Sequence, residues 1–303
     1  MVKGVLAVLG ASLIFGVLPT ANKFIILQGV AADNLTFYSQ LLIFCFSFLA
    51  AQVCKVNLKI KWSNRLQLML LGAIGMGLTM ALLNQSYQSL SVGLAVVLHF
   101  LYPTIVSAVM IFLFGHKLTG LKVLAMFGSV LGMILIMGIG QETNIEGIGM
   151  ILALLSSITY AIYIIANEKS AAAKLPIIGK IVYMSFGSML LFGLISLGRG
   201  SMTMPSDAKT WLLLLFFSGF GSFLAHLLIV HGISKIGASS AAFINMAEPV
   251  MGLMAGVLIY GDVFTVKTGC GMLLIMAAMF FVTIDNKAHV EEVEDCKQVN
   301  CSV

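Results

Sequence analysis

The chain is 303 residues long, with 60% hydrophobic residues, 10% charged residues and a formal net charge of +5. Soluble domains carry about 25% charged residues, so this composition excludes a soluble globular domain and predicts a polytopic membrane protein. The five cysteines are an odd number without paired or metal-ligand spacing. We therefore expect no disulfide framework and no metal site.

Ten apolar runs follow one another along the chain. A helix needs about 20 residues to cross a hydrocarbon core of roughly 30 Å, so each run predicts one transmembrane helix. The first run follows Lys3 like a signal peptide, but it is too long and lacks a small-residue cleavage site, so we interpret it as a retained helix. The runs cover 2–27, 35–54, 66–85, 92–114, 121–140, 147–166, 177–197, 211–230, 238–260 and 264–284.

The basic residues are distributed unevenly between the loops. Lys and Arg near helix ends favour the cytoplasmic side. With the N-terminus cytoplasmic, thirteen of the 17 basic residues fall on that side. This pattern predicts a plasma (cytoplasmic) membrane protein with both termini inside, and it predicts a polar cytoplasmic tail at 286–303. A nucleic-acid-binding patch at 55–65 is the competing interpretation, which we set aside, so no nucleic acid partner is expected.

The two halves of the chain repeat each other. Pro103 aligns with Pro249 at an offset that also aligns Gly115 with Gly261 and Thr119 with Thr265. At an offset one residue shorter, the first run aligns with the sixth through Gly4 and Gly149, Ser12 and Ser157, Phe15 and Tyr160, and Asn22 and Asn167. Five spans per half reverse the direction of the second half. We therefore predict an all-α integral membrane protein of ten transmembrane helices, in two inverted five-helix repeats at 1–140 and 141–285.

Two pairs of segments carry a family resemblance. They are SVGLAVVLHFLYPT followed by FGHKLT in the first half, and GASSAAFINMAEPV followed by YGDVFT in the second. In these segments the chain resembles the EamA family of the drug/metabolite transporter superfamily, over residues 1 to about 285. His116 departs from the pattern, because an acidic residue is usual there. The resemblance implies a secondary carrier for small organic metabolites, often an exporter, with a central cavity between two repeats, and it leaves the substrate open.

Glu248 is the one carboxylate that the predicted spans place near a membrane midplane. A charge at that depth costs roughly 2.5–3.5 kcal/mol on insertion scales, so we expect it to face a bundle interior or a wet cavity. The alternative is a protonated packing residue. Pro249 follows directly and predicts a kink, as Pro103 does in the first half, although both prolines are also compatible with packing alone.

Further candidates surround Glu248. Asn245 with Glu248, and His99 with Tyr102, each lie three residues apart and so share a helix face. The repeat pairs His99 with Asn245 and Tyr102 with Glu248, so we expect these faces to meet at mid-depth. Weaker candidates, each with a plain packing or interface interpretation, are His226, Tyr160, Phe15 and the embedded cation Lys23. Asn167 and Glu168 are expected to be solvated at a membrane edge.

These residues, together with the family resemblance, predict a secondary active transporter that works by alternating access. The resemblance implies export as the direction. Burial disfavours a charged carboxyl group, so proton exchange at Glu248 is a plausible coupling reaction. A passive channel or facilitator for small neutral solutes is the alternative. A membrane-embedded enzyme is a weaker one, since no nucleophile elbow, zinc motif or P-loop occurs. The expected partners are a small solute, the lipid bilayer and protons, without a cofactor. Neutral, zwitterionic or weakly cationic solutes fit the scarcity of embedded basic residues.

Overall fold

The computed structural model describes residues 1–90, 92–116, 119–137, 147–200, 202–205, 207–255 and 265–300. Within these ranges the only regular secondary structure is helical. Seven of the described helical segments are long and apolar enough to cross a membrane. Two shorter apolar stretches, Gly120–Leu135 and Val266–Val282, accompany them. The all-α membrane fold predicted from composition is therefore confirmed, whereas the count of ten spans stays a prediction.

Each apolar run corresponds to at least one helix that the structure describes. The first three spans are α1 (Val2–Leu27), α2 (Ala32–Val53), and α3 (Trp62–Leu71) continued by η1 (Gly72–Leu78) and α4 (Thr79–Ser86). Next come α5 (Val92–His99) with α6 (Tyr102–Phe112), and α7 (Gly120–Met137). The second half contains α8 (Gly147–Lys169), the short η2 (Ala171–Lys174), α9 (Ile177–Gly198), α10 (Ala208–Leu213) with η3 (Leu214–Gly221) and α11 (Ser222–Ile236), α12 (Ala238–Ile244) with α13 (Ala247–Ala255), and α14 (Val266–Asn300).

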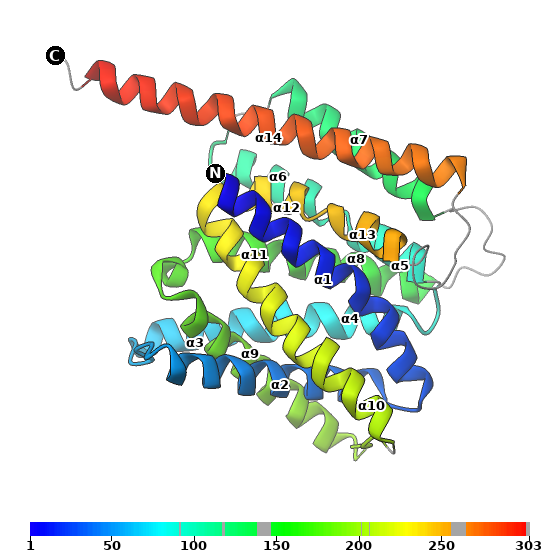
Figure 1. Ribbon diagram of the computed structural model, residues 1–303. Helices are drawn as coiled ribbons and strands as arrows, with labels where there is room; N and C mark the ends of the chain where they lie inside the picture. Colours follow the sequence, from blue (N-terminus) through cyan, green and yellow to red (C-terminus); the bar gives the residue numbers. More distant parts are fainter. Residues whose placement is uncertain are drawn as a thin grey trace.

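The helices form one bundle with two distinguishable ends. We call the end where α1 begins the N-side and the opposite end the far side. The start of α1, the start of α3 and the last turns of α14 lie toward the left of Figure 1, whereas α10 begins at the right. In this bundle α2 packs against α9, and α1 packs against α11 and α13. The helices α7 and α14 form a pair along the upper side of the bundle (Figure 1).

Two spans are interrupted near their centres, at matching places in the two halves. α5 ends at His99 and α6 begins at Tyr102, while α12 ends at Ile244 and α13 begins at Ala247. Proline has no backbone N–H, so Pro249 leaves the Asn245 carbonyl without its usual helical donor. That carbonyl accepts from Glu248 N at 2.9 Å instead. The two helix breaks lie just before Pro103 and Pro249, the prolines at which we predict kinks.

The third and eighth spans also match, because both contain a π-helical segment, η1 and η3. Such segments are rare and often occur at functional sites. Gly72, at the start of η1, lies directly against α9: a Cβ at this position would be 1.8 Å from the Met184 carbonyl oxygen. The sequence GAIGMGL therefore permits a helix contact that a larger residue would prevent.

Polar contacts hold the ends of several helices. Lys122 of α7 pairs with Asp285 of α14 at 3.3 Å. Asp207 caps α10 by accepting hydrogen bonds from the Thr210 hydroxyl at 2.6 Å and from the Thr210 amide at 2.9 Å. These hydrogen bonds lower the pKa of the Asp207 carboxyl group. The residues predicted to form a polar tail continue α14 as a helix to Asn300.

Candidate functional site

A cavity extends from the middle of the bundle toward the far side. Its volume is about 60 Å³. Its wall is formed by the first, third, fourth, sixth, eighth and ninth spans. The lining residues are Phe15, Leu18, Pro19, Asn22, Gly75, Met76, Thr79, Met80, Leu83, Asn84, Tyr87, His99, Tyr160, His226 and Glu248.

Glu248 is the acidic residue of this lining, and its side chain is partly exposed to the cavity. Asn245 Nδ2 donates to Glu248 Oε2 at 3.3 Å. Among the described residues this amide is the carboxylate's one hydrogen-bond partner. The second oxygen, Oε1, has no hydrogen-bond partner among those residues.

Asn245 lies behind Glu248 and is fully buried. Besides Glu248, its Nδ2 donates to the Tyr102 hydroxyl at 2.9 Å, and its Oδ1 accepts from Ser12 Oγ at 3.0 Å. The Tyr102 hydroxyl in turn donates to the Ala242 carbonyl at 3.3 Å. Both amide hydrogens and the amide oxygen are thus engaged, and they connect Glu248 to α1 and to α6 of the first half.

The backbone of Glu248 is held against α1 by a close approach of two glycines. A Cβ on Gly16 would lie 2.6 Å from the Glu248 carbonyl oxygen and 2.8 Å from the Gly252 nitrogen. Real Cβ atoms do not approach backbone atoms this closely, so α1 and α13 can only pack in this way with glycine at position 16. Glycine-mediated contacts of this kind are frequent between helices in lipid.

Aromatic rings form a continuous row beside the cavity. Phe15 meets His226 edge to face at 5.4 Å, and His226 meets Tyr163 at 5.9 Å between ring centroids. Tyr163 stacks on Tyr160 at 5.6 Å, and Tyr160 lies 5.3 Å from His99 and 4.6 Å from Tyr102. The row joins α1, α11, α8 and the α5–α6 break, so both halves of the chain contribute to it.

The hydrogen bonds of the two cavity histidines fix their orientation. His226 Nδ1 lies 2.7 Å from the Ser222 carbonyl oxygen, which only accepts, so Nδ1 carries the hydrogen. His99 Nδ1 lies 2.9 Å from Ser156 Oγ, whose own hydrogen is donated to the Ala153 carbonyl at 2.6 Å. His99 Nδ1 therefore donates as well. In the neutral form of each ring, Nε2 is left as an acceptor, and neither has a protein partner among the described residues.

The sequence-predicted candidates fall into three groups. Glu248, His99, Tyr160, Phe15 and His226 line the cavity. Asn245 and Tyr102 do not line it but support Glu248 from behind. Lys23 belongs to α1, and its side chain lies outside the part of the chain that the structure describes. The polar faces predicted to meet at mid-depth are in contact through the bond between Tyr102 and Asn245.

Several residues of the site were missed or misjudged. Asn22 and Asn84 are buried and line the cavity. Asn22 occurs seven residues after Phe15, a spacing that places both on one helix face, and this was the available signal. For Ser12, the sequence indicated a role only weakly, through its alignment with Ser157 in the internal repeat. Tyr87, just beyond α4, gave no signal in the sequence.

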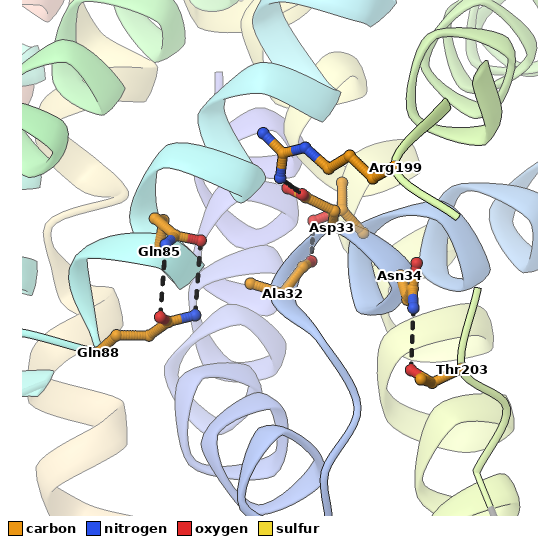
Figure 2. A network of polar contacts seen from close by, with 8 residues as sticks. Ala32, Asp33, Asn34, Gln85, Gln88, Arg199 and Thr203 are labelled. Atoms are coloured by element: carbon orange, nitrogen blue, oxygen red, sulfur yellow. Dashed lines mark hydrogen bonds and ion pairs between the residues drawn. The ribbon is translucent and has the colours of Figure 1, made fainter. Parts of the chain in front are cut away.

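The far end of the cavity lies near a polar network at the ends of α2, α4 and α9. Figure 2 shows Arg199 paired with Asp33, Asn34 donating to Thr203 Oγ1 at 2.9 Å, and Gln85 and Gln88 in a reciprocal amide pair. The Tyr38 hydroxyl also donates to the Thr203 carbonyl at 3.2 Å. This network attaches the segment after α9 to the start of α2, beside the spans that line the cavity.

Close helix contacts also occur in the N-side half. A Cβ on Gly232 of α11 would lie 2.3 Å from Val8 Cγ2, and one on Gly4 of α1 would lie 2.7 Å from Lys235 Cβ. Glu168 accepts a hydrogen bond from the first amide of α12, Ala238 N, and pairs with Lys169. Asn167 is buried and donates to the Tyr163 carbonyl at 2.9 Å. The expectation of solvation was therefore wrong for Asn167, whose side chain is buried and bonds within its own helix. Glu168 is partly exposed and also joins α8 to α12.

Known proteins resemble this chain over most of its length. A YicL protein of Salmonella typhimurium, described as an uncharacterized inner membrane transporter, is 26% identical over 297 residues, covering 94% of this chain and 96% of that protein. An uncharacterized transporter of Archaeoglobus fulgidus is 25% identical over 234 residues, covering 77% of this chain and 83% of that protein. One crystal structure of a protein superposes with a TM-score of 0.79 at 15% identity, over 92% of this chain and 98% of the other, and so shares the fold.

The family resemblance inferred from the motifs is confirmed by a match in each half. The sequence profile of the EamA-like transporter family matches residues 2–138 and again residues 147–284. Together the two matches cover nearly the whole chain, which therefore belongs to the EamA-like transporter family.

Proposed function

We propose that the chain is a secondary active carrier that moves small organic metabolites by alternating access, in the direction of export and in exchange for protons. The observation that carries this proposal is the partly exposed Glu248 in a cavity between the two halves. Amino acids, their derivatives and drug-like solutes are the classes we consider. Binding and movement of the solute require no covalent chemistry, so no catalytic residue is assigned.

The proposed units of movement are two inverted repeats, at 1–140 and 141–285, followed by the tail at 286–303. Their matching helix breaks before Pro103 and Pro249, and the π-helical segments in the third and eighth spans, support this division. The two separate family matches support it as well. In transporters with inverted repeats, substrate sites lie near the midplane at the repeat interface, often at discontinuous helices. Glu248 is the second residue of α13, which begins directly after such a break.

Alternating access requires two gates that are not open together. The tight contacts of α1 with α11, and of Glu168 with α12, support a closed N-side in this conformation. The cavity extends toward the far side, where the network of Figure 2 lies at the helix ends. We propose that transport exchanges these arrangements, so that the N-side contacts separate when the far-side network closes.

We propose an inner or plasma membrane location with the N-side cytoplasmic. The excess of Lys and Arg in the loops of that side supports this orientation. The name of the Salmonella relative, an inner membrane transporter, supports the location.

Glu248→Gln tests the proposed proton coupling, because it keeps the size of the side chain and its contact with Asn245 but removes the titratable group. The full chain would be reconstituted into vesicles containing a pH-sensitive dye, and proton movement would be followed after adding gradients of amino acids and amines. The wild type is expected to move protons in response to at least one solute. In the Glu248→Gln variant this response is expected to be lost.

Phe127→Leu, on the exposed surface of α7, is a suitable control because it lies away from the cavity. This variant is expected to behave as the wild type. Solute-driven proton movement that persists unchanged in Glu248→Gln would contradict the coupling role.

A further inference from the structure

We propose that the cavity selects primary amines: small organic monocations with an –NH₃⁺ group, an apolar body and no carboxylate. This inference specifies the solute of the site proposed above and therefore rests on that site being a solute site. It narrows the amino acids, derivatives and drug-like solutes considered there to one headgroup chemistry.

The number and type of hydrogen-bond acceptors in the cavity favour an ammonium group. Glu248 Oε1 has no partner among the described residues, and the same is true of Nε2 in His99 and in His226. With Nδ1 committed as a donor in each ring, Nε2 of the neutral imidazole is an acceptor. These acceptors come from three different spans that line one cavity. An ammonium group carries three N–H donors and no acceptor, so it complements this set.

The charge of the cavity lining favours a cationic solute. A partly buried carboxylate needs a countercharge or a proton. The described lining contains amide and hydroxyl groups, from Asn22, Asn84, Tyr87 and Tyr160, but no Lys or Arg side chain. A solute that brings one positive charge would neutralise Glu248. A solute with its own carboxylate would place a second negative charge beside Glu248, and like charges at short distance repel.

The aromatic side chains that line the cavity favour the same kind of solute. Phe15, Tyr160 and Tyr87 line the same cavity as Glu248. Aromatic faces attract cations that lie within about 6 Å of the ring centroid. The same rings also accommodate an apolar body, as do the neighbouring Leu18, Met76 and Leu83. Both parts of an apolar amine therefore find matching surfaces.

Ligands that differ only in the headgroup give the sharpest test. Phenethylamine, phenylalanine, 2-phenylethanol and trimethylated phenethylammonium share one apolar body. Isoamylamine, leucine and isoamyl alcohol provide a smaller body for the same comparison. Binding to the purified full chain would be measured by calorimetry for the wild type and for Glu248→Gln.

In at least one series, we expect the primary amine to bind about tenfold or more tightly than the amino acid and the alcohol, the effect of one charge-assisted hydrogen bond. The trimethylated cation keeps the charge but has no N–H donor, so it is expected to bind more weakly than the primary amine. Glu248→Gln is expected to lose the preference for the amine and to leave alcohol binding nearly unchanged. His226→Phe is expected to weaken binding of the primary amine but not of the trimethylated cation.

Three results would overturn the inference: tighter binding of the amino acid than of its amine, a preference for the amine that persists in Glu248→Gln, or no binding of an amine from either series. The outcomes for the proposed function are separate from these. If the protein bound amino acids and transported them together with protons, the proposed selectivity for amines would be rejected and the proposed carrier function would be retained. If the protein bound amines but produced no flux in vesicles, the selectivity for amines would be retained and the carrier function would be rejected.

Discussion

At the scale of single residues, Asn245 links the proposed coupling residue to the rest of the protein. Its amide group uses two donors and one acceptor on Tyr102, Glu248 and Ser12. When a buried polar group loses such a partner, the folded protein is destabilised by about 1–3 kcal/mol, because the desolvation of that group is no longer compensated. We infer that the state of Glu248 is transmitted through Asn245 to α1 and α6.

Ser12→Ala and Ser129→Ala form a matched pair that tests this link. Both serines are buried, and both hydroxyls bond to a carbonyl of their own helix at 2.9 Å, but only Ser12 also reaches Asn245. Ser12→Ala is therefore expected to weaken solute-driven proton movement, whereas Ser129→Ala is expected to leave it unchanged. Equal effects of the two substitutions would argue against a role for Asn245 as a link.

Tyr102→Phe and Tyr163→Phe provide a second matched pair. Both tyrosines are fully buried, but the Tyr102 hydroxyl has two hydrogen-bond partners and the Tyr163 hydroxyl has none among the described residues. Tyr102→Phe is expected to lower stability by about 1–3 kcal/mol, and Tyr163→Phe is expected to be neutral or stabilising. Unfolding of the purified protein in detergent, followed by intrinsic fluorescence, measures the difference. A larger loss for Tyr163→Phe would contradict the assignment of these contacts.

At the scale of helices, the contact between α1 and α13 positions Glu248. Gly16 permits this contact, and the break between α12 and α13 sets where the carboxylate enters the cavity. The position of the site therefore depends on the distance between two helix backbones.

Gly16→Ala is expected to separate α1 from α13, because the added carbon would meet backbone atoms of Glu248 and Gly252 that cannot rotate away. Solute binding and flux should fall strongly in this variant. Gly128→Ala is the control, since its added carbon would meet only the Leu274 carbonyl oxygen, at the ordinary distance of 4.0 Å. Calorimetric binding and vesicle flux for both variants provide the comparison. Normal binding by Gly16→Ala would mean that α13 is not fixed by this contact.

At the scale of the whole molecule, the sequence determined the fold class more completely than the site. Run lengths, the matched prolines and the pair of family motifs were sufficient to predict an all-helical membrane protein of the EamA-like family. They depend on local composition and spacing. Glu248 was found for the same reason, since a carboxylate in an apolar run is conspicuous in the sequence.

Contacts between spans were less predictable. Asn22, Asn84 and Ser12 join the site through the rotation and relative height of their helices, which periodicity alone does not determine. Asn167 was misjudged because its distance from the helix end suggested solvent, whereas packing of α8 buries it. The two π-helical segments also change the register within their spans, and nothing in the hydrophobic pattern indicated them.

The central claim is that two halves of this chain carry a solute across the membrane by exposing one cavity to each side in turn. Counterflow tests it most directly. Vesicles containing the full chain would be preloaded with an unlabelled solute from the amine and amino acid series, then diluted into a trace of the same solute in labelled form. A carrier is predicted to accumulate the label transiently above its outside concentration. Label that only equilibrates, without an overshoot for any solute that the protein lets through, would contradict alternating access and indicate a passive channel.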